Sequence, residues 1–438
     1  MYNIYYLHEH CQDEIFKELN QVYLPLEKIC KLDRFGQIQH NVVPDGDVSK
    51  LVDGDVIIPI DYQSNKLSYE DRSGITSISP LGEKVLEIVE TVNKKITNHK
   101  KIFLLYTSTE PYYNENSCFI ADLANAYKDC FFIMSGSGDV PNRYQHHVDK
   151  ILACKNVSII FKLWYFDRVH YIKEYSEYKD TPRHFVEYET SAPASVPSYI
   201  TCGNKFMLTM RNPRPHRLIM STLIEPHLDT IRYSRMWSLQ SWWLDNIKEN
   251  AEDEYQYQVN MLSVAIKEVL DDVDNDKFVN KMMHTIYGSP HILDMDGFQD
   301  KGHPPDWLYQ NINIAIIASG EPNGWGYADE KQMIPMYYRV PFITFGSKGV
   351  YEEMEKIGFN VYRDVFDLSF SEQDSVFDRV EWCYLTIKEI DELDQEDLIK
   401  LLDKCKPAIE KNYRHVKSGN FRHFSNGNFF EEMSHACS

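Results

Sequence analysis

The chain has 438 residues, of which 43% are hydrophobic and 13% aromatic, and its formal net charge is −20. This length exceeds one ordinary domain and the apolar content allows a sizeable core, so we expect a globular protein of two domains or one large α/β unit. The acidic excess argues against non-specific binding to nucleic acid or to an anionic membrane surface. It is compatible with a local basic cleft.

The cysteine and hydropathy patterns indicate the cellular setting. The nine cysteines are scattered and include no Cys-x-x-Cys pair, so the sequence indicates neither a zinc site nor a disulfide framework. A reducing, cytoplasmic location is therefore expected. The sequence has no run of eighteen or more apolar residues, which predicts no membrane span, and its first residues lack the basic flank and apolar stretch of a signal peptide.

The first half of the chain alternates short apolar strands with amphipathic helices. We expect helices over residues 81–96 and 118–129, and strands over residues 3–8, 56–60, 101–106, 130–136 and 156–166. Strand–helix alternation with continuously apolar strands is typical of a parallel sheet that is covered on both faces.

The second half repeats this alternation after an irregular stretch. Residues 179–204 contain several prolines and no clear period, as is typical of a connection between domains. Beyond them we expect helices over residues 257–273 and 348–358, and strands over residues 205–210, 311–319, 340–347 and 359–364. The C-terminal part is acidic and helical. The sequence therefore predicts two α/β halves joined by a Pro-rich hinge.

A carboxylate and several glycines follow the expected strand 311–319. Glu321 lies just past that strand, and ligands of open α/β sheets bind beyond the carboxyl ends of the strands. A carboxylate there can accept two hydrogen bonds from a ribose diol. Gly320, Gly324 and Gly326 would let the backbone approach a ligand closely. The alternative is an ordinary surface loop with solvated acids.

A short helix is expected to begin with Asp329, Glu330 and Lys331. The start of a helix supplies unpaired N–H groups and positive potential, and Lys331 adds a point charge. Together they suit a phosphate group.

A second cluster follows the expected strand 205–210. The segment MRNPRPHRLIM places Arg211, Arg214, His216 and Arg217 within seven positions of a chain whose net charge is −20. Guanidinium groups at a strand-to-helix turn form bidentate contacts with phosphate oxygens. The alternative is a surface cluster that pairs with neighbouring acidic residues.

These two segments together resemble a known family. MRNPRPHRLIMSTL and the segment from Gly326 to Phe370 look like a family of glycosyltransferase-like proteins common in large-genome phages and giant viruses. The Glu-gap-Glu-Lys arrangement is also similar to the sugar-nucleotide motif of α-1,3-fucosyltransferases. The resemblance covers residues 205–379, and the first half matches only at the level of fold. Asp329 stands where the family usually has Thr, and the gap from Glu321 to Lys331 is one residue short of the fucosyltransferase pattern.

The resemblance implies the architecture of a B-type glycosyltransferase, with two Rossmann-like domains facing each other across a cleft. Residues 1–195 would form the acceptor-side domain, and residues 196–398 the domain that binds the nucleotide sugar. In B-type enzymes the last helices often cross back onto the first domain, so the helical tail 399–438 is expected there. A viral protein of this kind would work in the host cytoplasm.

The resemblance also implies roles for individual residues. Glu321 would hold the donor ribose or sugar, whereas Lys331 and Arg217, with Arg211 as companion, would face the pyrophosphate. His216 would support the arginine loop. The remaining members of the implied donor site are Gly326, Tyr327 and Glu330. The arginine and lysine side chains would stabilise the departing diphosphate, so that neither a metal nor a cofactor is expected beyond the nucleotide-diphosphate sugar.

The acceptor side needs a group that orients or deprotonates a hydroxyl. Glu110 follows the strand 101–106 and Asp61 follows the strand 56–60, so both are candidate catalytic carboxylates. The alternative for either residue is a helix cap or a turn. The acceptor would be a glycan, a protein or a modified DNA base. The alternative function is a non-catalytic nucleotide- or carbohydrate-binding module of the same fold, and a third class is a structural interaction protein.

Other short motifs indicate no site. Asp294 and Asp296 form an Asp-x-Asp pattern, but it is common and here lies in a loop region rather than after a core strand. The segment from Asp272 begins like a calcium loop but lacks the required Gly and Glu. His8 and His10 would share a strand face without a third ligand. No Gly-Lys-Ser/Thr phosphate loop and no Gly-x-Ser-x-Gly elbow are present.

Overall fold

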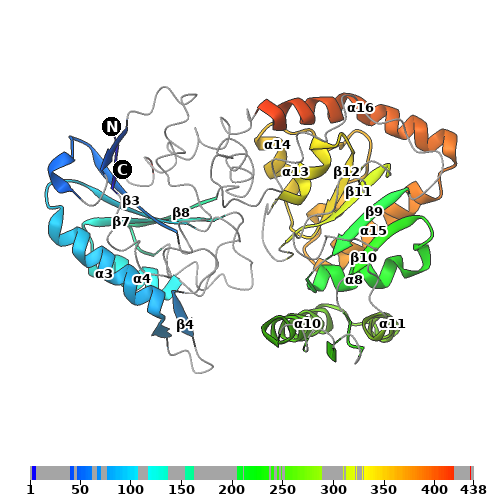
Figure 1. Ribbon diagram of the computed structural model, residues 1–438, viewed down its shortest axis with the longest axis horizontal. Helices are drawn as coiled ribbons and strands as arrows, with labels where there is room; N and C mark the ends of the chain where they lie inside the picture. The colour runs from blue at the N-terminus through cyan, green and yellow to red at the C-terminus, as the bar shows by residue number, and fades with distance from the viewer. Residues whose placement is uncertain are drawn as a thin grey trace. The chain divides into compact units, whose positions relative to one another are not determined.

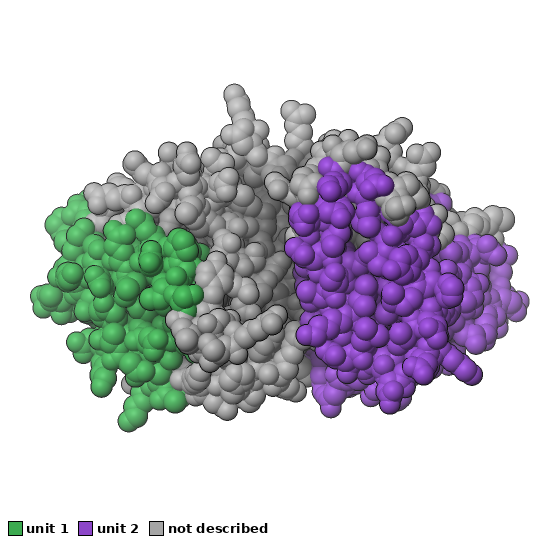
Figure 2. Space-filling view, turned by 90° about the horizontal axis from the view of Figure 1, so that it is seen from below, with its two compact units in different colours: residues 1–181, 420–438 green, residues 182–419 purple. Residues whose placement is uncertain are grey.

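The computed structural model describes residues 2–5, 40–43, 47–61, 67–70, 76–106, 117–136, 153–161, 205–210, 212–235, 238–240, 244–245, 248, 252–288, 309, 312–320, 322, 328, 330–418 and 435. The chain divides into two compact units, residues 1–181 with 420–438 and residues 182–419, which Figure 2 shows in different colours.

The first unit contains a six-stranded parallel sheet with the order β2-β1-β3-β6-β7-β8. Val56, Ile57 and Ile58 are all buried, and because neighbouring side chains of a strand point to opposite faces, both faces of the sheet are covered at β3. The strands are β1 (Tyr2–Tyr5), β2 (His40–Val43), β3 (Asp55–Asp61), β6 (Lys101–Tyr106), β7 (Cys130–Gly136) and β8 (Val157–Phe161).

Two helices lie along this sheet in Figure 1, α3 (Pro80–Lys95) and α4 (Ser117–Ala126). The N-terminus of α3 is well specified: the Ser79 side chain accepts a hydrogen bond from the Gly82 N–H at 2.9 Å, and Pro80 occupies the first helical position. A short antiparallel hairpin of β4 (Ser68–Glu70) and β5 (Thr76–Ile78) and the 3₁₀ helix η4 (Val48–Lys50) complete the described part of this unit.

The second unit is built on a four-stranded parallel sheet with the order β10-β9-β11-β12. Every residue of β11 and β12 is buried, so this sheet too is covered on both faces where those strands run. The strands are β9 (Phe206–Met210), β10 (Ile231–Arg235), β11 (Ile314–Ala318) and β12 (Phe342–Phe345).

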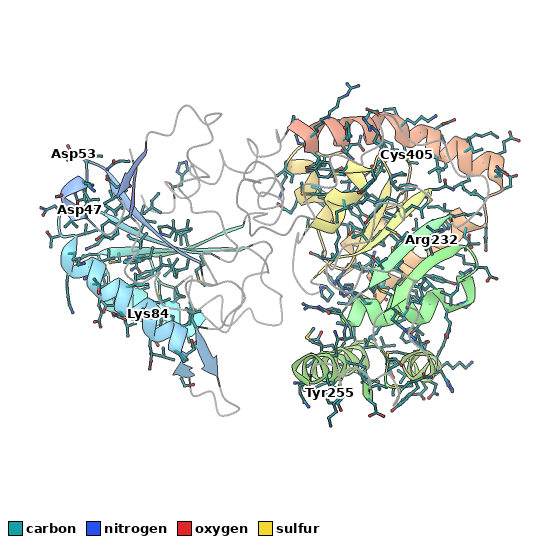
Figure 3. All side chains as sticks on the ribbon, in the orientation of Figure 1. Asp47, Asp53, Lys84, Arg232, Tyr255 and Cys405 are labelled. Atoms are coloured by element: carbon teal, nitrogen blue, oxygen red, sulfur yellow. The ribbon has the colours of Figure 1, made fainter. Side chains whose placement is uncertain are left out.

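The helices of the second unit pack in two groups. Helix α8 (Pro215–Ile224) contacts α10 (Glu252–Asp272), α11 (Asp276–Tyr287) and α15 (Val376–Asp391), whereas α13 (Glu330–Tyr337) contacts α16 (Gln395–Ser418). Cys405, labelled in Figure 3, lies on the buried face of α16. The shorter elements are η7 (Glu225–His227), α14 (Val350–Lys356) and η8 (Ser369–Glu372).

The expected α/β class with two parallel sheets is confirmed, and so is a long helix over residues 257–273, which is α10. The strand expected over residues 359–364 is wrong. Tyr362 has φ +65°, which breaks an extended run, and the Asn412 side chain binds both the N–H of Asn360 at 2.8 Å and its carbonyl at 2.7 Å. A side-chain amide thus takes the place of a neighbouring strand.

Residues 399–418, the first part of the expected C-terminal tail, continue α16, which contacts α13. The expected packing of the tail on the first domain stays a prediction. Within the described residues, no helix combines the length and the hydropathy that crossing a membrane would need.

At Gly82, helix propensity and close packing predict opposite effects of a substitution by alanine. Alanine would ordinarily be favoured in a helix by about 1 kcal/mol. At this position, however, a Cβ would lie 2.1 Å from the Leu67 carbonyl oxygen, which also accepts the Ser79 N–H. We therefore expect Gly82→Ala to lower the free energy of unfolding by about 1–3 kcal/mol in urea titrations followed by circular dichroism.

The matched control is Glu87→Ala, at an exposed position of the same helix. It should change the free energy of unfolding by less than about 0.5 kcal/mol. A Gly82→Ala protein that is more stable than the parent would contradict the close approach of Leu67.

Candidate functional site at the carboxyl ends of the second sheet

Three loops of the second unit begin at one edge of the sheet. Strands β9, β11 and β12 are parallel neighbours, so the loops that lead into α8, α13 and α14 all start at their carboxyl ends. Ligands of open α/β sheets bind at this edge. Of the basic residues expected from the sequence, His216 and Arg217 contact the end of β11 at this edge.

His216 lies in the first turn of α8 and is fully buried. Its Nε2 lies 2.7 Å from the Ser319 carbonyl oxygen. Because a carbonyl can only accept, the ring carries its proton on Nε2 and donates it. Burial, with the neighbouring Arg217 charge, lowers the pKa of His216 well below its ordinary value, so the imidazole is neutral. Among the described residues, Nδ1 has no hydrogen-bond partner.

Arg217 joins the loop after β9 to the end of β11. Its side chain is only 5% exposed, and Nη1 donates to the Asn212 carbonyl at 2.9 Å. Nη2 donates to the carbonyls of Ala318 at 3.3 Å and Ser319 at 3.2 Å. These contacts hold the main chain of the edge in place. The direct phosphate contact expected of Arg217 stays a prediction.

Arg379, on α15, is a site residue that the sequence did not single out. It is 3% exposed, and all four of its hydrogen bonds go to main-chain carbonyls. Burial lowers the pKa of its guanidinium to about 10, against the opposing effect of nearby aspartates, so the group is charged at neutral pH. The available signal was an arginine on the buried stripe of a helix that also carries Cys383 and Ile387.

The carbonyls that Arg379 binds come from three segments. Nε donates to Gly346 at 2.9 Å, Nη2 to Pro322 at 2.6 Å, and Nη1 to Gln373 at 2.6 Å and Asp374 at 2.8 Å. The guanidinium therefore links the loops after β11 and β12 to the start of its own helix.

The ends of β11 and β12 are packed too closely for a side chain at Gly346. This residue has φ +124°, and a Cβ would lie 2.3 Å from the Ser319 Oγ. That Oγ also accepts the Ser347 N–H at 3.2 Å, while the Ser319 N–H donates to the Phe345 carbonyl at 3.0 Å. Glycine suits this position because it adopts this φ without strain and leaves room for the Ser319 hydroxyl.

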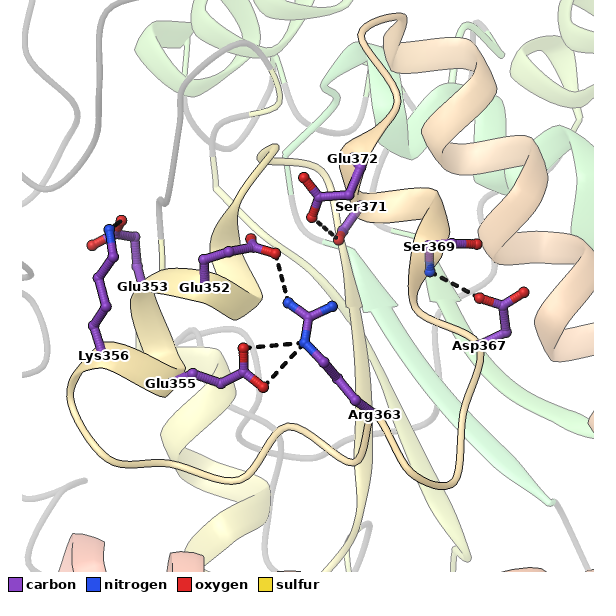
Figure 4. Close-up of polar contacts among 9 residues, drawn as sticks. All are labelled: Glu352, Glu353, Glu355, Lys356, Arg363, Asp367, Ser369, Ser371 and Glu372. Carbon is purple, nitrogen blue, oxygen red and sulfur yellow. Dashed lines mark hydrogen bonds and ion pairs between the residues drawn. The ribbon is translucent and has the colours of Figure 1, made fainter.

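Figure 4 shows the polar contacts around α14 and η8, in which Arg363 binds side chains of α14 and Ser371 binds its neighbour in η8. Arg363 donates from Nη2 to Glu352 at 2.6 Å and from Nε to Glu355 at 3.0 Å, and Ser371 donates to Glu372 at 3.0 Å. A hydrogen bond to Glu352 raises the pKa of Glu372. Burial acts to raise the pKa of Glu352, but hydrogen bonds from Glu372 and Arg363 outweigh it and lower that pKa.

Several expected site residues lie outside the described residues, namely Glu110, Arg211, Glu321, Gly326 and Tyr327. The motifs at His8, His10, Asp294 and Asp296 do so as well.

For two other expected site residues, the structure gives the position in a strand or helix but not the side chain. Asp61 is the last residue of β3, and Glu330 is the first of α13, but their side chains are not described. Lys331, the second residue of α13, is half-buried. In the part of the chain that the structure covers, no group of three His, Cys, Asp or Glu side chains could hold a metal ion.

No protein-family model matches the sequence, and no curated protein matches it. Among solved structures, the chain is similar to a trehalose-6-phosphate protein from E. coli bound with UDP-2-fluoro glucose, with 10% identity over 87% of this chain and 73% of that chain and a TM-score of 0.41. It is also similar to an alpha,alpha-trehalose-phosphate synthase (UDP-forming) from Burkholderia xenovorans in complex with glucose-6-phosphate, with 8% identity over 87% and 74% of the two chains and a TM-score of 0.39. Similarity at this level carries no conclusion about activity.

The neutral state of His216 predicts a pH-dependent stability. Since its pKa is depressed in the folded chain, the unfolded chain binds more protons below pH about 6.5, and stability should fall as the pH drops through that value. His216→Gln keeps a donor near Ser319 but cannot titrate. We expect it to reduce this loss by up to about 1.4 kcal/mol per pH unit between pH 6.5 and 5.

Urea titrations at pH 7, 6 and 5 measure this slope. His415, whose pKa burial also lowers, supplies a remaining dependence of the same sign in both proteins. Ser263→Ala, at an exposed position of α10, is the control and should keep the parent slope. An unchanged slope in His216→Gln would show that the buried imidazole does not titrate as described.

Proposed function

We propose that this protein is a glycosyltransferase that moves a sugar from a nucleotide-diphosphate donor to a hydroxyl acceptor. The observation that carries the proposal is the pair of buried guanidinium groups, Arg217 and Arg379, at the edge where β9, β11 and β12 end. The resemblance of this segment to viral glycosyltransferase-like proteins and to the fucosyltransferase motif supports the same assignment.

The charge of this edge suits a diphosphate. The chain carries a net charge of −20, yet Arg214, Arg217 and Arg379 lie close enough to His216 for all three to depress its pKa. The field of Arg217 and Arg379 is weakly screened because these two groups are buried. An anionic ligand with two phosphates is the class of small molecule that gains most from such a field.

The same charges favour the reaction. When the bond between the anomeric carbon and the diphosphate oxygen breaks, negative charge grows on the departing nucleoside diphosphate. Fixed cations bind that charge more strongly in the transition state than in the ground state, which lowers the barrier. In this proposal Lys331, at the start of α13, faces the diphosphate, and Glu321 accepts hydrogen bonds from the donor ribose.

The acceptor hydroxyl oxygen forms the new bond to the anomeric carbon. Its proton passes to a carboxylate of the first unit, for which Glu110 and Asp61 are the candidates. Glycans, proteins and modified DNA bases are the proposed acceptors. The proposal assigns charge neutralisation to side chains of the chain itself, with the nucleotide sugar as co-substrate.

A thermal-shift screen against uridine, guanosine, cytidine and adenosine diphosphates tests the donor site. A ligand present at a hundred times its dissociation constant should raise the free energy of unfolding by about 2.7 kcal/mol. Incubation with the matching nucleotide sugars then measures turnover. Consumption of donor supports transfer, stabilisation without consumption supports a binding module, and silence across the whole panel contradicts both.

Lys331→Gln tests the diphosphate contact directly. Hydrogen bonds to charged groups contribute about 1.5–3 kcal/mol, so we expect the affinity for the diphosphate found in the screen to fall about 10- to 100-fold in calorimetric titrations. Lys400→Gln, on the exposed face of α16, removes one positive charge elsewhere and should leave the affinity unchanged. Equal losses in both variants would mean that only net charge matters.

A further inference from the structure

The loop after β12 carries a lysine next to the carboxyl edge of the second sheet. The first two residues of this loop are fixed to the edge. The Gly346 carbonyl accepts from Arg379 Nε at 2.9 Å, and the Ser347 N–H donates to the Ser319 Oγ at 3.2 Å. Lys348 is the next residue. Its main chain therefore continues directly from a segment that is bound to the end of β11.

The Lys348 ammonium forms an ion pair with the Asp374 carboxylate, with 2.5 Å between Nζ and Oδ1. The lysine side chain is 30% exposed and the aspartate side chain is 86% exposed, so water reaches the pair. Exposed ion pairs add little to stability, because water screens the charges and holding two flexible side chains together costs entropy. This pair can therefore open at little cost.

Arg379 holds the main chain on both sides of this ion pair. Its Nη1 donates to the Asp374 carbonyl at 2.8 Å, and its Nε donates to Gly346, two residues before Lys348. Its Nη2 donates at 2.6 Å to the carbonyl of Pro322, in the loop after β11. The ion pair thus lies on the same anchor as the loops after β11 and β12.

Lys348 differs from the two buried guanidinium groups at this edge. Arg217 and Arg379 are buried and donate to main-chain carbonyls, so they act on a ligand mainly through their electrostatic field. An ammonium on a flexible four-carbon stem has three rotatable donors and can turn from one oxyanion to another. Lys348 is therefore suited to direct contact with a phosphate.

We propose that Lys348 binds a phosphate oxygen of the nucleoside diphosphate, and that Asp374 holds the ammonium as an exchangeable anion until the diphosphate binds. This inference rests on the proposed function and adds a ligand contact and a competing carboxylate to its donor site. No covalent bond changes, because the ammonium exchanges one oxyanion for another. A diphosphate carries more negative charge than a carboxylate, so the exchange favours the ligand.

Asp374→Asn removes the competing carboxylate and keeps the size of the side chain. The probe is the nucleoside diphosphate that stabilises the parent most in the thermal-shift screen. We expect its affinity to rise about threefold in calorimetric titrations, because binding no longer has to open the ion pair. Asp378→Asn is the control, since it removes a negative charge from an exposed position of α15 near Arg379. An equal rise in both variants would reduce the effect to net charge and overturn the exchange.

Lys348→Gln removes the ammonium. We expect the affinities for the same diphosphate and for inorganic pyrophosphate to fall about tenfold. Lys356→Gln, which breaks a similar ion pair with Glu353 on α14, should leave both affinities unchanged. When Asp374→Asn is added to Lys348→Gln, it should bring no gain, because no ammonium is left to release. A gain in the double variant as large as that in Asp374→Asn alone would contradict the inference.

The outcomes separate this inference from the proposed function. Diphosphate binding without consumption of any nucleotide sugar contradicts sugar transfer, while the two substitutions still decide whether the exchange occurs. Binding that neither Asp374→Asn nor Lys348→Gln alters overturns the exchange alone. If neither the parent nor Asp374→Asn binds a nucleoside diphosphate or pyrophosphate, both proposals are wrong. Because the pair is exposed, we expect the variants to fold, and circular dichroism checks this.

Discussion

The second unit depends on how the carbonyl groups beyond its parallel strands are satisfied. A strand end has no further ladder partner, and a buried carbonyl without a donor is costly. Here buried basic side chains supply the donors: His216 and Arg217 bind the main chain after β11, and Arg379 binds it after β11 and β12. The edge of the sheet is therefore rigid and positively charged for the same reason.

Burial of the Arg217 and Arg379 guanidinium groups is tolerated because each donates several hydrogen bonds to main-chain carbonyls. A buried charge without partners would cost several kcal/mol. Aspartate charges near the start of α15 raise the pKa of Arg379 and partly offset the lowering by burial. The carbonyls do not cancel a positive charge as a carboxylate would.

In the described part of the first unit, neutral asparagine side chains bind main-chain groups of the loops. The Asn156 amide donates to the carbonyls of Ala124, Tyr127 and Cys130 around the end of α4. Asn3, in β1, binds the Val52 backbone in both directions. Neutral amides bind the loops without adding a net charge that would create a positive electrostatic potential. In the proposed function, the unit with the buried guanidinium groups is the one that binds the charged substrate.

The sequence by itself determined the α/β class, the apolar strands and the long amphipathic helices, because periodicity and caps such as Ser79 act over a few residues. It also located His216 and Arg217 at a strand end. The place of residues 359–364 and the role of Arg379 were decided only by tertiary structure. Asn412 lies 52 positions from Asn360, and Arg379 lies 57 positions from Pro322. Hydrogen bonds over such separations leave no local pattern, since they exist only once the strands and helices have packed together.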